Sequence, residues 1–211
     1  MLPALAILEK KAPLQRLVGM MGDFEQLDPA GYRQWLNRFP QLATLPRIGQ
    51  AQGASYSDER ALALRPQVAI FGLGGGHGPG ERNREILARL EQSGTAVLFV
   101  DFRHDPLTNT PRSIELLGRV LGRNAEAAEF NAYWHQQLER VRSRLPTDLA
   151  EAPRVYLDSR AGLSEGCCDT MVGMMGKLLD AAGGKNIARG LIPGEHGTLN
   201  LEHLLARQPT V

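Results

Sequence analysis

A ten-residue pattern occurs twice in this chain, and the second copy begins 143 positions after the first. Five residue types recur at the same spacing: Glu59, Leu62, Ala63, Pro66 and Val68, and again Glu202, Leu205, Ala206, Pro209 and Val211. In each copy a short helical stretch runs into a proline, which ends the helix, and a strand then begins. The pattern therefore predicts a chain built from two related halves.

The second copy of the pattern stops where the first one continues. The first copy runs from Val68 through an apolar stretch into the glycine-rich run 72–76, whereas the chain ends at Val211. We therefore expect the second half to lack a C-terminal piece. A parallel sheet that stops early leaves a strand edge unpaired, so self-association of the chain is also expected.

Strand and helix patterns alternate along the chain. Apolar and β-branched runs predict strands at 14–20, 68–71, 96–100 and 154–157, and capped periodic stretches predict helices that begin at 29 and 57, span 81–92 and end at 182. Residues 158–170 are predicted to form a loop. This alternation predicts an α/β fold with parallel sheets covered by helices.

A long helical region is predicted in the middle of the chain. Thr110 is expected to cap it and Pro111 to be its first helical residue. The helix pauses at 122–124 and resumes over 125–145, a length of about 30 Å at 1.5 Å per residue. This second stretch carries an apolar stripe: Phe130, Trp134, Leu138, Val141 and Leu145.

These patterns together predict two Rossmann-like lobes with parallel sheets, joined by a long rigid helix, with the second lobe incomplete. The expected divisions are an N-terminal lobe over 1–110, a helical linker over 111–146 and a partial C-terminal lobe over 147–211. The composition fits a globular protein, with 43% hydrophobic residues and a net charge of +1. This charge balance gives no indication of nucleic-acid or membrane-surface binding.

The glycine-rich run after the 68–71 strand has one feature of a nucleotide-binding loop, because glycines there let phosphate groups approach backbone N–H groups. The spacing differs from the dinucleotide fingerprint, whose third glycine position falls on His77 or Pro79. Lys177 is no P-loop lysine, because Met171 stands where that motif needs glycine. We interpret the run as a loop at the carboxyl edge of a parallel sheet, where such folds bind ligands.

Four other side chains are candidates for ligand contact from their positions. His77 and His104 lie on loops that leave neighbouring strands at this edge. Arg103 and Arg160 closely follow predicted strands, and a guanidinium there would hold a carboxylate or another anionic group. The alternative for each arginine is a surface ion pair.

The chain has two cysteines, the neighbours Cys167 and Cys168. We interpret them as two small loop residues, and a redox switch or a vicinal disulfide are the alternatives. Ser159 and Ser164 are not in the Gly-x-Ser-x-Gly setting of a nucleophilic serine. No catalytic group is therefore assigned, and no bound cofactor is expected.

Several segments resemble one family. They are 17–20, 59–71, 101–103, 109–118, 166–170, 182–188 and 199–211. The stretches 101–118 and 166–170 are most similar to the siderophore branch. The chain resembles the substrate-binding proteins of ABC importers for ferric siderophores, haem and cobalamin, whose two lobes are joined by one long helix. It departs from that family at Gln67 and Thr210, where members carry aspartate, and members also begin with a signal peptide and a strand that precede residue 1.

The resemblance implies capture of an iron–siderophore complex between two lobes and delivery to an ABC permease, in the periplasm or lipid-anchored outside the cytoplasm. Haem or cobalamin is the alternative ligand of this class, and a nucleotide- or thiol-dependent α/β enzyme is the alternative class. We expect the ligand to contact Met21, Asp23, Leu73, His77, Arg103, His104, Arg160, Cys167 and Cys168. Glu81 is expected to dock the first lobe on the permease, and a stabilising interaction with its own helix dipole is the alternative.

Overall fold

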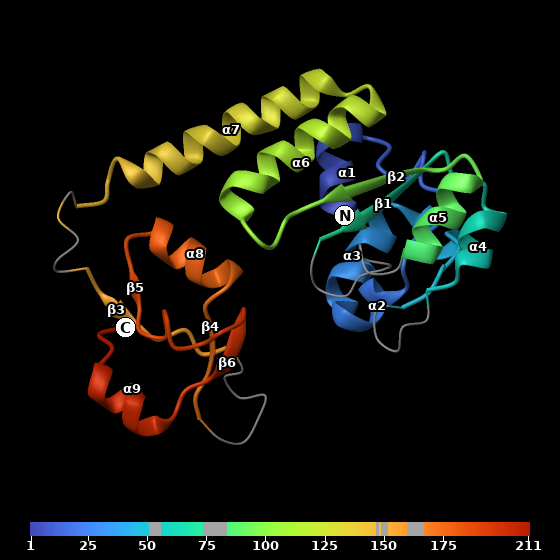
Figure 1. The fold of residues 1–211 in the computed structure, drawn as a ribbon. Coiled ribbons are helices and arrows are strands. Elements are labelled where there is room, and N and C mark those ends of the chain that lie inside the picture. Colours follow the sequence, from blue (N-terminus) through green and yellow to red (C-terminus); the bar gives the residue numbers. More distant parts are fainter. Residues whose placement is uncertain (51–55, 74–83, 147, 149–151, 160–166) are drawn as a thin grey trace. The chain divides into compact units, whose positions relative to one another are not determined.

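The computed structural model describes residues 1–50, 56–73, 84–146, 148, 152–159 and 167–211 (Figure 1). The chain forms two compact units. The first comprises Met1–Arg103 and Arg112–Phe130, and the second comprises His104–Pro111 and Asn131–Val211. The predicted divisions at 110 and 146 stay a prediction.

The first unit is organised around two parallel strands, β1 (Val68–Gly72) and β2 (Ala96–Val100), paired in register from Val68 opposite Ala96 to Gly72 opposite Val100. Both strands confirm the prediction. Because side chains alternate along a strand, Ile70, Leu98 and Val100 pack on one side and Ala69, Phe71, Val97 and Phe99 on the other. Each face of the pair is therefore apolar.

Helices cover both faces of this strand pair (Figure 1). On one face, Ala4 and Leu8 of α1 (Leu2–Glu9) and Ile114 and Leu117 of α6 (Pro106–Leu121) are buried. On the other face, the buried residues include Ala61 of α4 (Asp58–Ala63) and Leu90 of α5 (Arg84–Gln92). The α5 start predicted at 81 lies outside the described residues.

The remaining elements of the first unit are α2 (Asp23–Leu27), α3 (Pro29–Arg38) and the 3₁₀ helix η1 (Pro40–Thr44). The predicted start of α3 is confirmed, since Asp28 accepts a hydrogen bond from Gly31 N at 2.8 Å. The strand predicted over 14–20 is wrong. Leu14 lies in a turn and buries its side chain beside α1 and α3, and within that stretch only Met20 forms a bridge, parallel with Arg47.

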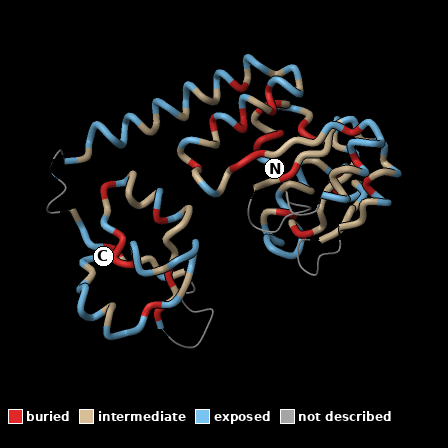
Figure 2. Tube along the Cα trace, in the orientation of Figure 1, coloured by how far each residue is buried: buried red, intermediate tan, exposed pale blue. Residues whose placement is uncertain are grey.

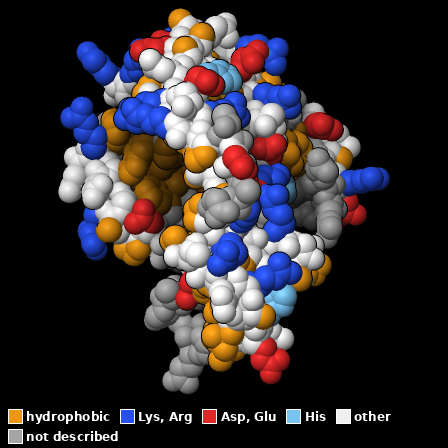
Figure 3. Space-filling view, turned by 90° about the vertical axis from the view of Figure 1, so that its left-hand side faces the viewer, with side chains coloured by type: hydrophobic (Ala, Val, Ile, Leu, Met, Phe, Trp, Pro, Cys, Tyr) orange, Lys and Arg blue, Asp and Glu red, His pale blue; other side chains and the backbone are white. Residues whose placement is uncertain are grey.

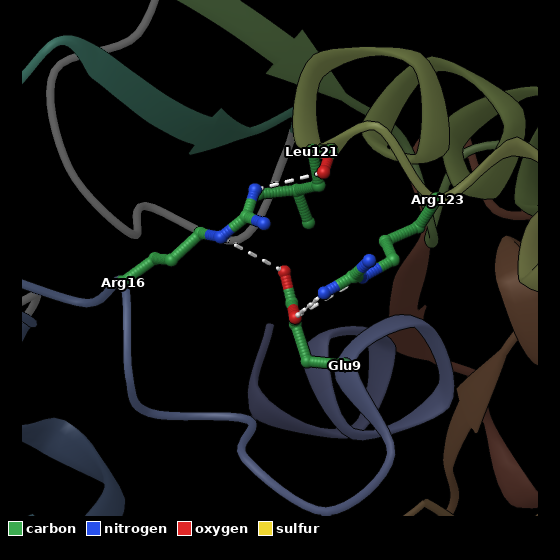
Figure 4. Close-up of polar contacts among 4 residues, drawn as sticks. All are labelled: Glu9, Arg16, Leu121 and Arg123. Atoms are coloured by element: carbon green, nitrogen blue, oxygen red, sulfur yellow. Dashed lines mark hydrogen bonds and ion pairs between the residues drawn. The ribbon is translucent and has the colours of Figure 1, made fainter.

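A buried carboxylate joins α1 to the end of α6 (Figure 4). The Glu9 side chain is 5% exposed, and Arg123 donates to its Oε2 from Nε at 3.2 Å and from Nη2 at 3.1 Å. Arg16 forms an ion pair with Glu9 Oε1 at 3.4 Å and donates from Nη1 to the Leu121 carbonyl at 2.8 Å. Glu9 thus connects the end of α1 to the nearby Arg16 and to Arg123, which is 114 residues further along the chain.

The start of α6 differs from the prediction, which placed the cap at Thr110. The helix begins at Pro106, and Pro111 lies inside it. Proline lacks an N–H, so the Leu107 carbonyl loses its helical partner. Trp134 donates to that carbonyl from Nε1 at 3.3 Å, and Asn131 donates to the Pro111 carbonyl at 3.0 Å. Trp134 therefore supplies the donor that Pro111 lacks, and Asn131 adds a second side-chain bond at the same turn.

The pause after α6 is confirmed, and α7 (Asn124–Arg142) follows it. Its predicted stripe is only partly covered, since Phe130, Trp134 and Leu138 are half-buried and Val141 is 45% exposed. Leu145 is half-buried and lies beyond the end of the helix. Figure 2 shows that most of α7 is exposed, apart from a buried position near its start.

The second unit contains two small strand pairs. β3 (Arg154–Val155) and β5 (Lys185–Asn186) are parallel, and β4 (Asp169–Met171) and β6 (His196–Thr198) are antiparallel. The strand predicted over 154–157 is shorter than expected, and the predicted loop over 158–170 ends in β4. The helices are α8 (Met174–Ala181) and α9 (Leu201–Arg207). The parallel pairs with helices confirm the α/β fold class.

The two copies of the repeat have the same local backbone geometry. Ser57 caps α4 by accepting from Arg60 N at 3.2 Å, and Asn200 caps α9 by accepting from His203 N at 2.7 Å. Both caps and both N–H donors are 143 positions apart. The second copy ends alongside β3 without forming a regular strand, since Tyr156 N donates to the carbonyl of Val211 at 3.0 Å.

We expect Glu9→Gln to lower the free energy of unfolding by about 1–3 kcal/mol, because two arginines lose a charged acceptor. Their partial exposure, 37% for Arg123 and 50% for Arg16, keeps the loss below that of a fully buried pair. Urea unfolding measures the change. Glu129→Gln is the matched control, since Glu129 is 72% exposed in its pair with Lys10. Equal effects of the two substitutions would contradict the role given to Glu9.

Candidate functional site

The carboxyl ends of β1 and β2 lie at one edge of the first unit. Leu73 follows β1 and donates from its N–H to the Val100 carbonyl at 2.8 Å, which continues the strand pairing by one residue. Asp101, Phe102 and Arg103 follow β2 directly. In parallel sheets this edge is the usual place for a ligand.

A buried serine fixes the backbone that leaves β2. Ser113 Oγ accepts from Asp101 N at 2.9 Å and donates to the Asp101 carbonyl at 3.0 Å. Both residues are buried, Asp101 at 7% and Ser113 at 5% exposure. Asp101 Oδ1 then accepts from Arg103 N at 2.8 Å. The start of the loop that carries Arg103 is therefore held by hydrogen bonds to α6 and within itself.

Arg103 is one of the two arginines predicted to contact the ligand. Its side chain is half-buried, and its Nε has no hydrogen-bond partner among the described residues. It lines a groove of about 1180 Å³ whose wall includes Phe102 and Leu73. A guanidinium nitrogen in a mainly apolar groove is suited to an anionic oxygen of a ligand.

Two further predicted residues, Met21 and Asp23, line the same groove. Met21 is half-buried, and it precedes Gly22, whose N–H donates to the Gly49 carbonyl at 2.7 Å. Asp23 begins α2 and is 6% exposed. The structure therefore brings Met21, Asp23, Leu73 and Arg103 to the lining of one groove in the first unit.

The other predicted site residues are not brought together by the described part of the chain. His77, Arg160 and Glu81 lie outside the described residues. His104 belongs to the second unit, where it is exposed and its carbonyl accepts from Lys177 Nζ at 2.5 Å. His104 is not among the residues that line the groove of the first unit.

Cys167 and Cys168 are joined by a disulfide, which corrects the interpretation of two small loop residues. Spacing alone could not distinguish these alternatives. Cys167 is exposed, whereas Cys168 is 1% exposed and its carbonyl accepts from Leu199 N at 3.0 Å. Neither sulfur is a free thiol in this structure.

Tyr156 contacts Asp169, the first residue of β4. Its hydroxyl donates to the Asp169 carbonyl at 3.1 Å. Burial raises the pKa of the Tyr156 phenol, and the negative charges of Asp158 and Asp169 raise it further. Tyr156 therefore stays a neutral hydrogen-bond donor up to a higher pH than an ordinary tyrosine.

The sequence analysis did not single out Phe102 or Ser113 as site residues. Phe102 lines the groove, and Ser113 positions the loop. The signal for Phe102 was its position directly after a predicted strand. A serine that bonds to a strand end twelve residues earlier has no local sequence signature.

The described residues contain no group of three His, Cys, Asp or Glu side chains placed to hold a metal ion. No helix among them is both long and apolar enough to cross a membrane. On the face shown in Figure 3, basic and acidic side chains are mixed, without a large area of one sign. The described arrangement is suited to binding an anionic or mixed polar and apolar ligand.

Comparison with protein families shows that residues 27–211 match the family described as periplasmic binding protein. A comparison with curated proteins finds no match. Solved structures share the fold. The TroA-like periplasmic binding protein FepB from Veillonella parvula has a TM-score of 0.81 at 21% identity, over 99% of this chain and 59% of the other.

Two further structures are similar. The periplasmic haem-binding protein HutB of Vibrio cholerae has a TM-score of 0.66 at 18% identity, over 98% of this chain and 70% of its own. The Haemophilus influenzae molybdate-binding protein MolA has a TM-score of 0.68 at 16% identity, over 99% of this chain and 64% of its own. At these identities the structures establish the fold and not the ligand.

We expect Ser113→Ala to lower the free energy of unfolding by about 1–3 kcal/mol, because the buried Asp101 N–H loses its acceptor. Amide exchange at Asp101 and Arg103 should also become faster. Ser143→Ala is the matched control, since Ser143 is exposed and its hydroxyl donates to the Arg140 carbonyl at 3.4 Å. Unchanged exchange at both amides in Ser113→Ala would show that Ser113 does not position this loop.

Proposed function

We propose, since the chain belongs to the periplasmic binding protein family, that it is the substrate-binding component of an ABC importer and captures an iron–siderophore complex. The captured complex would be delivered to a membrane permease, outside the cytoplasm. The chain spans 59% of the length of the Veillonella chain, and the proposal concerns the whole protein. No chemical step is required of such a protein.

The observation that carries the proposal is the position of Arg103 in the first-unit groove. Arg103 is half-buried and lines the same groove as Phe102 and Leu73, on a loop held by Ser113. A ferric siderophore combines charged or polar chelating oxygens with apolar surface, and such ligands are bound by a few placed polar groups in an apolar site. Hydrogen bonds to charged groups contribute about 1.5–3 kcal/mol each.

Haem or cobalamin is the alternative ligand. Structures similar in fold include haem-binding proteins of Vibrio cholerae and Pseudomonas aeruginosa, and a molybdate-binding protein of Haemophilus influenzae. Haem iron requires an axial ligand, for which His77 and His104 are the candidates of this chain. Absorbance of bound haem distinguishes this ligand from an iron–siderophore complex.

The less favoured class is an enzyme that uses a nucleotide or a thiol pair. Its thiol form needs a reactive thiolate, whereas Cys167 and Cys168 are joined to each other. Its nucleotide form needs phosphate affinity in the 72–76 run. Titration of the full-length protein with ATP and with NAD, followed by calorimetry, tests that form directly.

We expect the full-length protein to bind ferric siderophores, with quenching of tryptophan fluorescence as the signal. A series of ferric catecholate, ferric citrate, ferric hydroxamate and haem identifies the class of ligand. Arg103→Ala should weaken the binding of an anionic chelate about tenfold or more, because a charged hydrogen-bond donor is lost. A neutral hydroxamate should be affected less.

The matched control is Arg89→Ala, which removes an arginine that is 60% exposed in its ion pair with Asp58. Its affinity should equal that of the unmodified protein. If Arg103→Ala also leaves the affinity for anionic chelates unchanged, Arg103 is not part of the site. Binding of haem alone from the series would replace the siderophore proposal with the haem alternative.

We further propose that Glu81 contacts the permease, as the family resemblance implies. Glu81→Arg in the full-length protein should leave ligand affinity unchanged and abolish uptake in cells, because the charge that faces the permease is reversed. Glu139→Arg, which reverses an exposed charge on α7, is the control and should transport normally. Normal transport by Glu81→Arg would contradict the assignment.

A further inference from the structure

The disulfide of the second unit joins Cys167 and Cys168, which are neighbours in the chain. A disulfide stabilises a fold mainly by restricting the unfolded chain, and this contribution grows with the length of the loop that it closes. Neighbouring residues close the shortest possible loop, so this bridge contributes little to global stability. It restricts the backbone of the pair itself, because the two side chains and the peptide bond between them form one small ring.

The two cysteines differ in their exposure. Cys167 is exposed, whereas Cys168 is 1% exposed and packs in a core cluster with Ala188 and Leu199. Thiol–disulfide exchange begins when an external thiolate attacks one sulfur of the bridge, so access to one cysteine is sufficient. Cys167 is the residue of the pair that solvent reaches, and Cys168 connects the pair to the interior of the second unit.

Hydrogen bonds from two other segments meet at the start of β4, directly beside the bridge. The Cys168 carbonyl accepts from Leu199 N at 3.0 Å. The carbonyl of Asp169, the next residue, accepts from Ser159 N at 3.0 Å and from the Tyr156 hydroxyl at 3.1 Å. A change in the backbone of the cysteine pair would therefore reach both the 156–159 segment and the residue before the cap of α9.

We propose that the Cys167–Cys168 bridge is a redox-sensitive switch, and that its reduction by a dithiol weakens the hydrogen bonds at the start of β4. A thiolate of the reductant attacks Cys167 Sγ and forms a mixed disulfide, while Cys168 Sγ leaves with the electron pair of the broken bond and takes up a proton. The second thiolate of the reductant then attacks the mixed disulfide and releases Cys167, which also takes up a proton. The reductant is oxidised to a disulfide, and the pair is reduced to two thiols.

The two states differ in backbone freedom and less in packing. Reduction opens the ring, so the backbone of both cysteines regains conformational freedom. The Cys168 side chain remains suited to its apolar surroundings, because a free cysteine behaves as a small hydrophobic residue. The core is therefore kept while the carbonyl that accepts from Leu199 is less restrained. This inference concerns the second unit and does not depend on the proposed ligand.

Hydrogen exchange on the full-length protein tests the switch. Dithiothreitol, added to the folded protein, should make both cysteines available to iodoacetamide, as counted by mass spectrometry. Amide exchange at Ser159 and Leu199 should then become about fivefold faster or more, because local opening is easier without the ring. Exchange at Lys185, whose N–H donates to the Pro153 carbonyl at 2.8 Å in the same unit, should stay unchanged. Reoxidation should restore the slow exchange.

Two variants separate the bridge from other effects of the reductant. Cys167→Ser removes the bridge and keeps the buried Cys168, so exchange at Ser159 and Leu199 should be fast with and without dithiothreitol. Met175→Ser is the matched control, because Met175 is a sulfur-containing residue of the same unit, is 38% exposed and leaves the bridge intact. This control should respond to dithiothreitol as the unmodified protein does.

Several results would overturn the proposal. One is modification of both cysteines without a reductant, which would show that the bridge does not form. Another is modification only after unfolding in urea, which would show that the bridge does not exchange in the folded protein. Equal exchange at Ser159 and Leu199 in the oxidised and reduced protein would also contradict it. Acceleration of Lys185 to the same extent would show that the bridge stabilises the whole unit and is not a local switch.

Discussion

The fold of the first unit depends on helices that cover both faces of its parallel strand pair. β1 and β2 are apolar on both faces, so each face needs helices to remove it from water. α1 and α6 cover one face and α4 and α5 the other, and Val100 and Phe71 are almost fully buried between them. Because the strands are parallel and in register, Leu73 and Arg103 emerge at the same edge. The position of the candidate site is thus a consequence of how this core is covered.

Polar side chains add to the apolar packing by forming hydrogen bonds with buried groups near the ends of the helices. Ser113 satisfies both backbone groups of buried Asp101, and Trp134 satisfies the carbonyl that Pro111 leaves without a helical partner. Glu9 performs a similar role with two arginines. An unpaired polar group in the interior destabilises the folded state. Each of these side chains therefore stabilises the fold mainly because it pairs a buried group, and less through the strength of its own hydrogen bond.

Local patterns predicted much of this structure. β1, β2 and the caps at Asp28 and Ser57 have signals that lie within a few residues, and all are confirmed. The strand predicted at 14–20 failed because apolar residues that pack under a helix have the same composition as those in a buried strand. The α6 start failed because the partner that makes Pro111 tolerable, Trp134, is twenty-three residues away. The residues that line the groove come from several segments that are far apart in the sequence. The sequence predicts that the loops after β1 and β2 lie at the carboxyl edge of the strands, but it does not predict which side chains meet there.

The repeat also extends to two residues in the left-handed region of backbone space. Arg65 has a φ of 47° and Gln208 a φ of 41°, and each precedes a proline 143 positions from the other. This conformation costs a residue with a side chain about 1–2 kcal/mol, yet it is present in both copies with different side chains. The two copies therefore share this backbone conformation, although the residue is arginine in one copy and glutamine in the other. Backbone torsion angles therefore relate the two halves at a position that a comparison of their residues would miss.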